Sequence, residues 1–424
     1  MASPTHIDSY YAATAHPWEL SPVLRGAETC DVCVIGGGIT GCSAALHLAQ
    51  RGFKVILLEG QRIGWGASGR SGAQVIPGFA RDIDVLATQV GAQDACRLWE
   101  MSVAAVHLVK ELIEAHTIDC EWQAGQMHVA IKPRQARSLK ATQALLAETY
   151  DYPLRYLEGE EFHTLLRSPR YIGGLLDHQA GHVHPLNYTL GLAAAARKEG
   201  VRIFEASAVS RYDVGQTPIA YTAEGQVNAG QLVFAGNAYL GKLVPALSRK
   251  IMPVGTYIAA TAPLGERAAS VITNNMAVTD INFVLDYFRL SGDKRLLFGG
   301  RVSYSTVPPP NLKATMRARL VQVFPQLHDV KIDHAWGGYV DISFNRAPHI
   351  GRLNPNVYFA QGFSGHGMAL TGFAGKLIAE AIAGTNERFD VFARIQHRDF
   401  PGGTLFRLPA LWLGTFYYRL RDLL

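Results

Sequence analysis

Charged side chains, cysteines and long apolar runs are all scarce in this sequence. Asp, Glu, Lys and Arg make up 18% of the 424 residues, and they form no run of five or six like charges. Hydrophobic residues reach 48%, which excludes a disordered, collagenous or coiled-coil chain. The net charge of +5 is mild for this length, so nucleic-acid binding has no support. At about 150 residues per domain, we expect two or three domains.

The few cysteines argue against disulfides and against a metal site. All five lie in the first third of the chain, and an odd, one-sided set suits a reducing compartment. Cys30 and Cys33 form a CxxC pair in an expected strand, where positions three apart face opposite sides. His182 and His184 have no Cys, Asp or Glu cluster beside them. We therefore expect no metal.

Neither end of the chain carries a membrane signal. The first twenty residues have no basic region and no apolar core, so no signal peptide is expected. The longest late apolar stretch, 408–418, has about half of the ~20 residues that a membrane span needs, and it contains Pro409. We expect a cytoplasmic protein.

Glycine, in contrast, is abundant and concentrated in two places. Of 42 glycines, eleven fall between Gly36 and Gly78, and nine more fall between Gly337 and Gly384. Glycine is favoured where the backbone takes positive φ or approaches another group closely. The two distant segments are therefore predicted to be shaped around one common object.

The first glycine segment carries a dinucleotide-binding pattern. An expected strand at 31–35 runs into Gly36-Gly37-Gly38-Ile39-Thr40-Gly41, a helix follows, and a second strand at 54–59 ends in Glu59. In such a unit Gly36 makes the tight turn, Gly38 lets the backbone approach a pyrophosphate, and Gly41 lets the helix pack on the strand. The helix N-terminus favours the phosphates, and Glu59 can accept hydrogen bonds from the ribose hydroxyls.

The next segment favours FAD over NAD. Residues 64–74 read Gly-Trp-Gly-Ala-Ser-Gly-Arg-Ser-Gly-Ala-Gln, where an NAD-binding chain would normally continue with another βαβ unit. Here the chain resembles the D-amino-acid-oxidase-like FAD-dependent oxidoreductase superfamily. The resemblance implies an α/β (α+β overall) fold: a Rossmann-like FAD-binding domain of glutathione-reductase type with an interleaved antiparallel-sheet substrate domain.

The middle of the chain is consistent with two interleaved domains. Apolar spacing of three and four predicts long helices over 82–116, then a strand at 127–131 and a helix at 133–149. Residues 251–305 alternate as strands, with a hairpin at Ser-Gly-Asp-Lys, 291–294. We predict an FAD-binding domain from 1–95, 155–250 and 335–400, a substrate domain from 96–154 and 251–334, and a helical tail at 401–424.

The second glycine segment also leads into the N-terminus of an expected helix. The expected strand 357–361 runs through Gly362-Phe363-Ser364-Gly365-His366-Gly367 into a helix from about Met368. In the superfamily, such a helix N-terminus faces the N1–C2=O edge of the flavin, where it stabilises developing negative charge. Both glycine segments would then hold the same FAD.

One substitution inside that region indicates the substrate class. Oxidases of α-amino acids and sarcosine in the superfamily carry W-x-G-[IL]-R-P, with the arginine on the substrate carboxylate. Counting from Trp336, this chain has Val340 in place of the arginine and Asp341 in place of the proline. A bidentate carboxylate clamp is lost there, and an amine suits Asp341 better.

The group-level resemblance runs over nearly the whole chain. The segments GYVDIS (338–343) and 400–424 look most like the γ-glutamylputrescine oxidoreductase group. Residues 70–73 read Arg-Ser-Gly-Ala, where that group usually has Arg-Asn-Gly-Gly.

The resemblance also implies which residues contact the cofactor. Ser68, Arg70 and Ser71 would lie near the pyrophosphate and ribityl chain, Ala73 and Gln74 near the isoalloxazine, and the backbone of Val209 at the adenine. The complete predicted FAD set is Gly36, Gly38, Ile39, Thr40, Gly41, Glu59, Gly60, Ala67, Ser68, Arg70, Ser71, Gly72, Ala73, Gln74, Val209, Ala235, Gly236, Asn237, Gly338, Gly362, Phe363, Ser364, Gly365, His366, Gly367 and Met368. No histidine lies at 66–74 and no cysteine follows Cys120, so FAD is expected to be non-covalent.

The expected reaction is FAD-dependent oxidation of an amine, such as a γ-glutamylated polyamine, by hydride transfer to flavin N5. O2 or another electron acceptor would reoxidise the flavin. The candidate catalytic residues, from motif position alone, are Tyr257, Tyr287, Arg289, Tyr339, Asp341 and His366, with Phe363 also beside the amine. For each tyrosine or arginine of the sheet, a purely structural role is at least as favoured.

Two other functions stay open. The first is oxidation of an N-methyl or α-amino acid, with Arg289 replacing the lost clamp. The second is a non-catalytic flavoprotein that lies on a membrane surface through residues 405–424, although packing on the domain or on a dimer partner is favoured for that segment. A homo-oligomer is possible, and the sequence does not distinguish an oxidase from a dehydrogenase.

Overall fold

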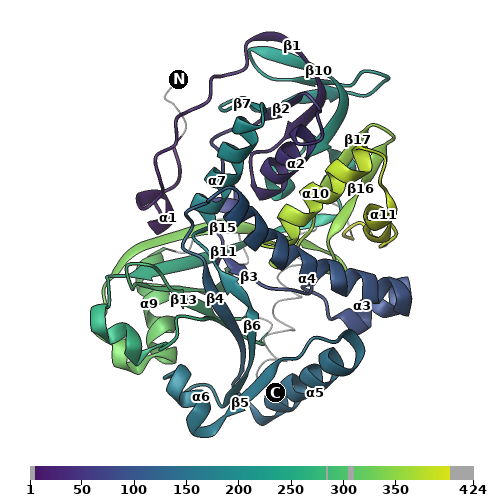
Figure 1. Ribbon diagram of the computed structural model, residues 1–424. Coiled ribbons are helices and arrows are strands. Elements are labelled where there is room, and N and C mark those ends of the chain that lie inside the picture. Colours follow the sequence, from purple (N-terminus) through teal and green to yellow (C-terminus); the bar gives the residue numbers. More distant parts are fainter. Residues whose placement is uncertain (1–4, 283–284, 304–309, 402–424) are drawn as a thin grey trace.

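Two large sheets organise the chain (Figure 1). The computed structural model describes residues 5–282, 285–303 and 310–401. The first sheet has eight strands: β1 (Gly26–Ile35), β2 (Val55–Leu58), β7 (Arg202–Phe204), β8 (Arg211–Asp213), β9 (Ile219–Tyr221), β10 (Gly225–Phe234), β16 (His349–Asn354) and β17 (Val357–Gln361). The second has nine: β3 (Gln74–Val75), β4 (Gln123–Ala130), β5 (Arg155–Glu158), β6 (Gly173–His182), β11 (Ile251–Thr261), β12 (Ala277–Asp280), β13 (Tyr287–Leu290), β14 (Leu296–Ser303) and β15 (Ile332–Ser343).

The helices cover both sheets. They are α1 (Tyr10–Ala13), α2 (Ile39–Ala49), α3 (Ile83–Val90), α4 (Ala92–Ala115), α5 (Pro133–Tyr150), α6 (Gly159–Leu165), α7 (Pro185–Lys198), α8 (Pro245–Ser248), α9 (Leu312–Val323), α10 (Leu370–Ile382) and α11 (Glu387–Ala393). Short 3₁₀ turns lie at η1 (Ala67–Gly69), η2 (Asn237–Leu240), η3 (Gly265–Ser270) and η4 (Pro325–Leu327). No described helix is long and apolar enough to cross a membrane.

The first sheet contains the predicted βαβ unit. β1 pairs in parallel with β2 on one side and with β10 on the other, and β10 pairs in parallel with β17. The strand ends at 32–35 and 55–58 are fully buried, as expected for parallel strands that are covered on both faces. The strand, helix, strand order predicted for residues 31–59 is confirmed.

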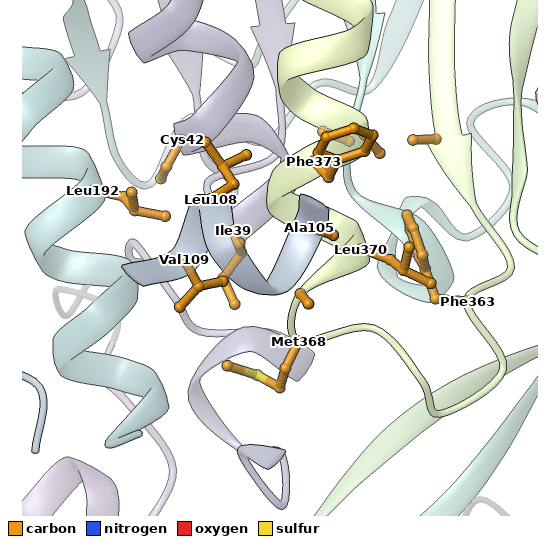
Figure 2. Packing of buried hydrophobic residues seen from close by; sticks show 14 of the residues in the cluster. Ile39, Cys42, Ala105, Leu108, Val109, Leu192, Phe363, Met368, Leu370 and Phe373 are labelled. Atoms are coloured by element: carbon orange, nitrogen blue, oxygen red, sulfur yellow. The ribbon is translucent and has the colours of Figure 1, made fainter. Parts of the chain in front are cut away.

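The largest core fills the space between helices α2, α4, α7 and α10. Figure 2 shows Ile39 and Cys42 of α2, Leu108 and Val109 of α4, and Phe373 of α10 converging there. Each such aliphatic or aromatic side chain stabilises the fold by roughly 1.5–3 kcal/mol when fully buried. The core therefore fixes α2 and α10 side by side, and with them the two glycine segments that precede these helices.

The second sheet is mostly antiparallel, and its two faces differ. β13 and β14 form the predicted hairpin around residues 291–295. One face packs on α9 through a second core that includes Phe288, Phe298 and Leu320. The other face carries Tyr287, Arg289 and Trp336 and looks toward the first glycine segment. Gln74, one of the residues expected beside the isoalloxazine, bonds to β12 of the same sheet.

The CxxC pair lies differently from the prediction. The backbone N–H groups of Asp31 and Val32 both donate to the carbonyl of Lys54, at 2.9 and 3.2 Å, so β1 carries a bulge there. Cys30 and Cys33 lie in the same hydrophobic cluster instead of on opposite faces. Both thiols are free, and burial raises their pKa values.

Sheet membership refines the domain division that we propose. The segment 155–182 was assigned to the FAD-binding domain, but β5 and β6 pair within the second sheet. β15 also belongs to the second sheet. We therefore propose that 155–182 and 332–343 belong to the substrate domain. The predicted tail at 401–424 lies outside the described residues beyond Pro401.

The contact between α2 and α10 gives a matched pair of glycine variants. A Cβ on Gly375 would lie 2.5 Å from the backbone oxygen of Thr40, whereas a Cβ on Gly372 would meet its nearest atom at 3.5 Å. We expect Gly375→Ala to lower the free energy of unfolding by about 3 kcal/mol or more, because backbone must move. Gly372→Ala in the same helix is the control, with a change between zero and a gain of about 1 kcal/mol. Denaturant melts of both variants check this, and equal stabilities would contradict it.

Candidate functional site

The turn after β1 has no room for side chains. A Cβ on Gly36 would lie 2.8 Å from the carbonyl carbon of Ala235, and Gly36 has φ +115°. A Cβ on Gly38 would lie 2.8 Å from Ser68 Oγ, and one on Gly41 only 1.8 Å from the oxygen of Gly36. Gly36 and Gly41 meet backbone and require glycine, as the sequence pattern predicted, whereas a side chain at Gly38 would displace the Ser68 hydroxyl.

The N-terminus of α2 is open for an anion. Gly38 caps the helix and has no side chain to satisfy its first N–H groups. Of these groups, Ile39 N–H donates to Ser68 Oγ at 3.0 Å. A bare helix N-terminus with small residues around it is a ready phosphate site. Thr40 lies buried in the same first turn.

Glu59 lies at the end of β2, beside the glycine turn. Its carboxylate accepts hydrogen bonds from Gly37 N–H and Gln61 N–H, each at 2.7 Å. Burial raises the pKa of this carboxyl, and the two N–H donors oppose that rise. A Cβ on Gly60 would touch Ala208, which places the neighbouring Val209 at the same end of the site. This is the end predicted for ribose and adenine.

The loop after β10 faces the glycine turn from the opposite side. Ala235 N–H donates to Ile35 O at 2.8 Å, and Gly236 lies within 2.8 Å of a Cβ built on Gly36. Asn237 adopts a left-handed φ of 50° and accepts from Gly362 N–H at 3.3 Å. The loop therefore joins the two glycine segments directly.

Two buried arginine nitrogens near the first glycine segment lack hydrogen-bond partners among the described residues. They are Arg62 Nε and Arg70 Nη2. Arg70 Nε donates to Trp65 O at 2.7 Å, and its guanidinium lies 4.1 Å from the centre of the Trp65 ring. An orphaned buried donor is costly, so each fits an acceptor supplied by a ligand.

The segment 71–74 crosses the inner face of the second sheet. A Cβ on Gly72 would lie 2.5 Å from the ring of Tyr287. The side chain of Gln74 donates to Val278 O at 3.0 Å and accepts from Thr279 Oγ1 at 2.6 Å. The loop that follows the βαβ unit is thus locked to the second sheet.

Ser71 and Ala73 complete this segment. Ser71 Oγ lies 3.1 Å from Met368 Sδ, next to the second glycine segment. Ala73 has φ +64°, a conformation that costs a non-glycine residue about 1 kcal/mol. This strain explains why glycine stands at the corresponding position in the group that the chain resembles.

Asp341 holds the second glycine segment in place. Its carboxylate accepts from the N–H groups of Gly362 and Phe363, and its own carbonyl accepts from Ser364 N–H at 2.9 Å. Ser364 and Gly365 take left-handed φ values of 55° and 88°. The expectation that Asp341 faces a substrate amine is not supported, because backbone donors already occupy its buried carboxylate.

Tyr257 and Tyr339, both candidates from motif position, have different surroundings. Tyr257 belongs to the core on the α9 side of the second sheet, whereas Tyr287 lies on the other face. Its strand partner is Gly337, whose Cβ would lie 2.9 Å from the Tyr257 ring. Tyr339 packs against Tyr239, with ring centres 5.8 Å apart. Since strand parity sets the facing direction, Tyr257 is a packing residue there.

Gly338 and Val340 do lie on the inner face of β15. A Cβ on Gly338 would be 3.4 Å from Arg70 Cβ, and Val340 Cγ1 would lie 3.4 Å from a Cβ on Gly365. The aliphatic side chain of Val340 therefore packs directly on the second glycine turn.

Two neutral histidines line the inner wall. His366 Nε2 donates to Pro77 O at 2.9 Å, and burial lowers its pKa to about 4. His128 was missed by the sequence reasoning. Burial, with His366 nearby, lowers the pKa of His128 to about 4. The alternation of Met127 and Val129 with polar neighbours on β4 could have revealed it.

Arg289 is also on the inner face, but its nitrogens are occupied. Nη2 donates to Val183 O at 2.8 Å and to Tyr11 Oη at 3.1 Å, and Nε donates to Gly72 O at 3.3 Å. The side chain is 3% exposed. It therefore does not present a free fork for a substrate carboxylate.

These residues together fit FAD. The cradle that a Cβ would fill at Gly36 and Gly38, the bare N-terminus of α2 and the orphaned donors of Arg62 and Arg70 suit a pyrophosphate. On this arrangement Glu59 would bind the ribose, and the segments 71–74 and 362–368 would flank the isoalloxazine.

Replacing Arg70 tests the orphaned donor. Arg70→Met removes one charge-assisted hydrogen bond to FAD, worth roughly 1.5–3 kcal/mol, so we expect the dissociation constant of FAD to rise about tenfold to a hundredfold. Fluorescence titration of the FAD-free protein with FAD measures it. Arg211→Met is the control, because Arg211 is exposed and paired with Asp213 at 3.0 Å. An unchanged dissociation constant for Arg70→Met would place the phosphates elsewhere.

The pKa of Asp341 predicts a pH dependence of stability. Burial raises this pKa from 3.8 to about 6, with the hydrogen-bond donors opposing the rise. Because the folded-state pKa is the higher one, its stabilising contribution is complete below about pH 4 and is lost as pH rises through about 6. We expect the stability of the native protein relative to Asp341→Asn to fall by up to about 3 kcal/mol across that window. Denaturant melts at several pH values check this, and a constant difference would refute it.

Comparisons with known proteins give the family of the chain. The family model described as FAD dependent oxidoreductase matches residues 31–381. The chain is 43% identical to gamma-glutamylputrescine oxidoreductase of Escherichia coli (strain K12), over 98% of each protein. It is 42% identical to the probable oxidoreductase OrdL of Haemophilus influenzae, over 98% of this chain and 97% of that protein.

Among solved structures, the chain is similar to glycine oxidase from Geobacillus kaustophilus. The TM-score is 0.73 at 19% sequence identity, covering 88% of this chain and 100% of that chain. This likeness supports the fold alone. With the family match and the full-length relatives, it establishes that the chain belongs to the FAD-dependent oxidoreductase family whose fold is that of D-amino-acid oxidase, and that FAD is its cofactor.

Proposed function

We propose that this protein oxidises the amine of a γ-glutamylated polyamine such as γ-glutamylputrescine. The proposal is supported by the E. coli relative named gamma-glutamylputrescine oxidoreductase, which aligns over nearly its full length. Bound FAD would supply the redox chemistry by taking a hydride at N5 from the carbon next to the amine nitrogen. Water would then hydrolyse the imine to an aldehyde, and O2 or another acceptor would restore the oxidised cofactor.

The observation that carries this proposal is the aliphatic side chain at position 340. Val340 packs on Gly365 at the inner face of β15, where relatives that act on amino acids place a carboxylate-binding arginine. The nearest replacement considered, Arg289, is committed to Val183, Tyr11 and Gly72. An α-amino or N-methyl amino acid would therefore find no clamp at either position, which favours the amine over that alternative.

The chain's own residues would position the amine and keep it neutral. His128 on β4 of the second sheet and His366 in the second glycine segment, both with a pKa of about 4, offer uncharged imidazoles. Hydride loss from the adjacent carbon needs the nitrogen lone pair, so a neutral amine is the reactive form. A pocket that excludes water and holds the amine through neutral acceptors would keep the amine in this neutral form.

Several finer features belong to the same proposal. We propose that FAD is bound without a covalent link, that the enzyme works in the cytoplasm, and that a homo-oligomer is possible. The membrane-surface alternative depended on residues 405–424, which lie outside the described residues.

Anaerobic mixing tests the substrate. The FAD-loaded protein is mixed with γ-glutamylputrescine, and with sarcosine, glycine and putrescine as comparison compounds. We expect rapid bleaching of the flavin absorbance by γ-glutamylputrescine and at least tenfold slower bleaching by the two amino acids, which corresponds to about 1.4 kcal/mol of transition-state discrimination. Faster bleaching by sarcosine or glycine would favour the amino-acid alternative, and no bleaching by any amine would favour a non-catalytic role.

Two further measurements complete this test. Peroxide yield per turnover distinguishes an oxidase from a dehydrogenase. Denaturation should release yellow flavin into solution, and colour that stays with the protein would contradict non-covalent binding.

A further inference from the structure

The buried guanidinium of Arg289 is surrounded by uncharged groups. Its acceptors are the carbonyls of Gly72, Val183 and Leu290 and the hydroxyl of Tyr11, and its Nη1 also lies 3.4 Å from His182 Nδ1. Burial and the guanidinium itself lower the pKa of His182 to about 3, so this imidazole is neutral. Burial raises the pKa of Tyr11, so the phenol is neutral too.

No carboxylate in the described part of the chain forms an ion pair with Arg289. Two other arginines, one on α9 and one at the β13–β14 hairpin, differ in this respect. Arg319 pairs with the buried Asp286, and Arg295 pairs with Asp293 and Asp333. A buried cation without a counterion costs several kcal/mol, even when its hydrogen bonds are satisfied. The positive charge of Arg289 is therefore uncompensated.

The position of this charge connects it to the cofactor. Arg289 Nε bonds the carbonyl of Gly72, and Gly72 precedes Ala73 and Gln74. These are the residues expected beside the isoalloxazine, and the family membership establishes that FAD binds. In an interior of low dielectric constant, a unit charge acts over several ångströms with little screening.

We propose that Arg289 is an electrostatic residue of the flavin site, whose positive charge favours the reduced, anionic form of bound FAD. Two-electron reduction by hydride adds two electrons and one proton to the neutral oxidised ring, which leaves one negative charge on it. The hydride comes from the substrate, and Arg289 neither gains nor loses a proton. The midpoint potential of the bound flavin is raised, whichever amine is oxidised.

Tyr11 is the positioning residue for this charge. It is completely buried, accepts from Arg289 Nη2, and meets Trp336 edge-on with ring centres 5.2 Å apart. Tyr11 belongs to α1, in the N-terminal segment that runs down beside α7 to the second sheet (Figure 1). This segment is fixed on both sides of Tyr11, by Tyr10 Oη to Asp293 at 2.9 Å and by Thr14 Oγ1 to His184 at 3.0 Å.

The midpoint potential of the FAD-loaded protein tests the proposal. Arg289→Met removes the charge and Arg289→Lys keeps it, whereas both lose the planar fork. We expect Arg289→Met to lower the equilibrium constant for reduction at least tenfold, about 30 mV for a two-electron couple, and Arg289→Lys to stay close to the native value. Equilibrium titration against a reference dye gives the potential without any substrate. Arg295→Met is the control, since Asp293 and Asp333 already neutralise that arginine on the same hairpin.

Three outcomes would overturn the proposal. If the midpoint potential is unchanged in Arg289→Met, the role of Arg289 is structural. The same holds if Arg289→Lys lowers the potential as much as Arg289→Met does. An equal shift in Arg295→Met would make the effect non-specific. If Arg289→Met does not hold FAD, Arg289→Gln removes the charge while keeping donors for Val183 and Tyr11. Tyr11→Phe is expected to give a smaller shift in the same direction, and an unchanged potential there would remove the positioning role of Tyr11.

Discussion

The close approach of bare backbone around the N-terminus of α2 is the constraint on which the rest of the structure depends. Gly36 and Gly41 bring β1, α2 and the 235–237 loop within van der Waals contact, and Gly375 brings α10 against the first turn of α2. Because backbone meets backbone, no side chain of the cap residue covers the first N–H groups of α2, and only the hydroxyl of Ser68 reaches one of them, that of Ile39. The same contacts hold the two glycine segments next to each other.

The second sheet depends on that arrangement through two anchors. The segment 71–74 lies against Tyr287 and Thr279, so the loop leaving the phosphate end is part of the substrate wall. Asp341, at the end of β15, fixes the N–H groups of Gly362 and Phe363. A buried carboxylate held by backbone donors is expensive to ionise. Its hydrogen bonds hold the start of a turn in which Ser364 and Gly365 take left-handed φ values.

The sequence allowed prediction of the features that are local. The βαβ unit, the hairpin at 291–295 and the strand leading into Gly362 depend on periodicity and glycine spacing within a few residues. The side of the sheet that Tyr257 faces, the bulge that brings Cys30 beside Cys33, and the occupation of Asp341 by backbone donors depend on register between distant strands. His128 and the N-terminal segment with Tyr11 were not found, because their roles arise only when β4, α1 and the glycine loops come together.

The charges near the cofactor also have a common sign. Arg289 and Arg70 are partly or fully buried cations without an acidic partner among the described residues, and His128 and His366 are held neutral. A positive local potential disfavours an ammonium group and favours the free amine, since it lowers the pKa of any amine bound there. On the proposed function, the same potential then stabilises the negative charge that appears on the ring after hydride transfer. The positive charge would therefore favour both the neutral amine before hydride transfer and the anionic flavin after it. A carboxylate facing the amine, as first expected of Asp341, would disfavour both.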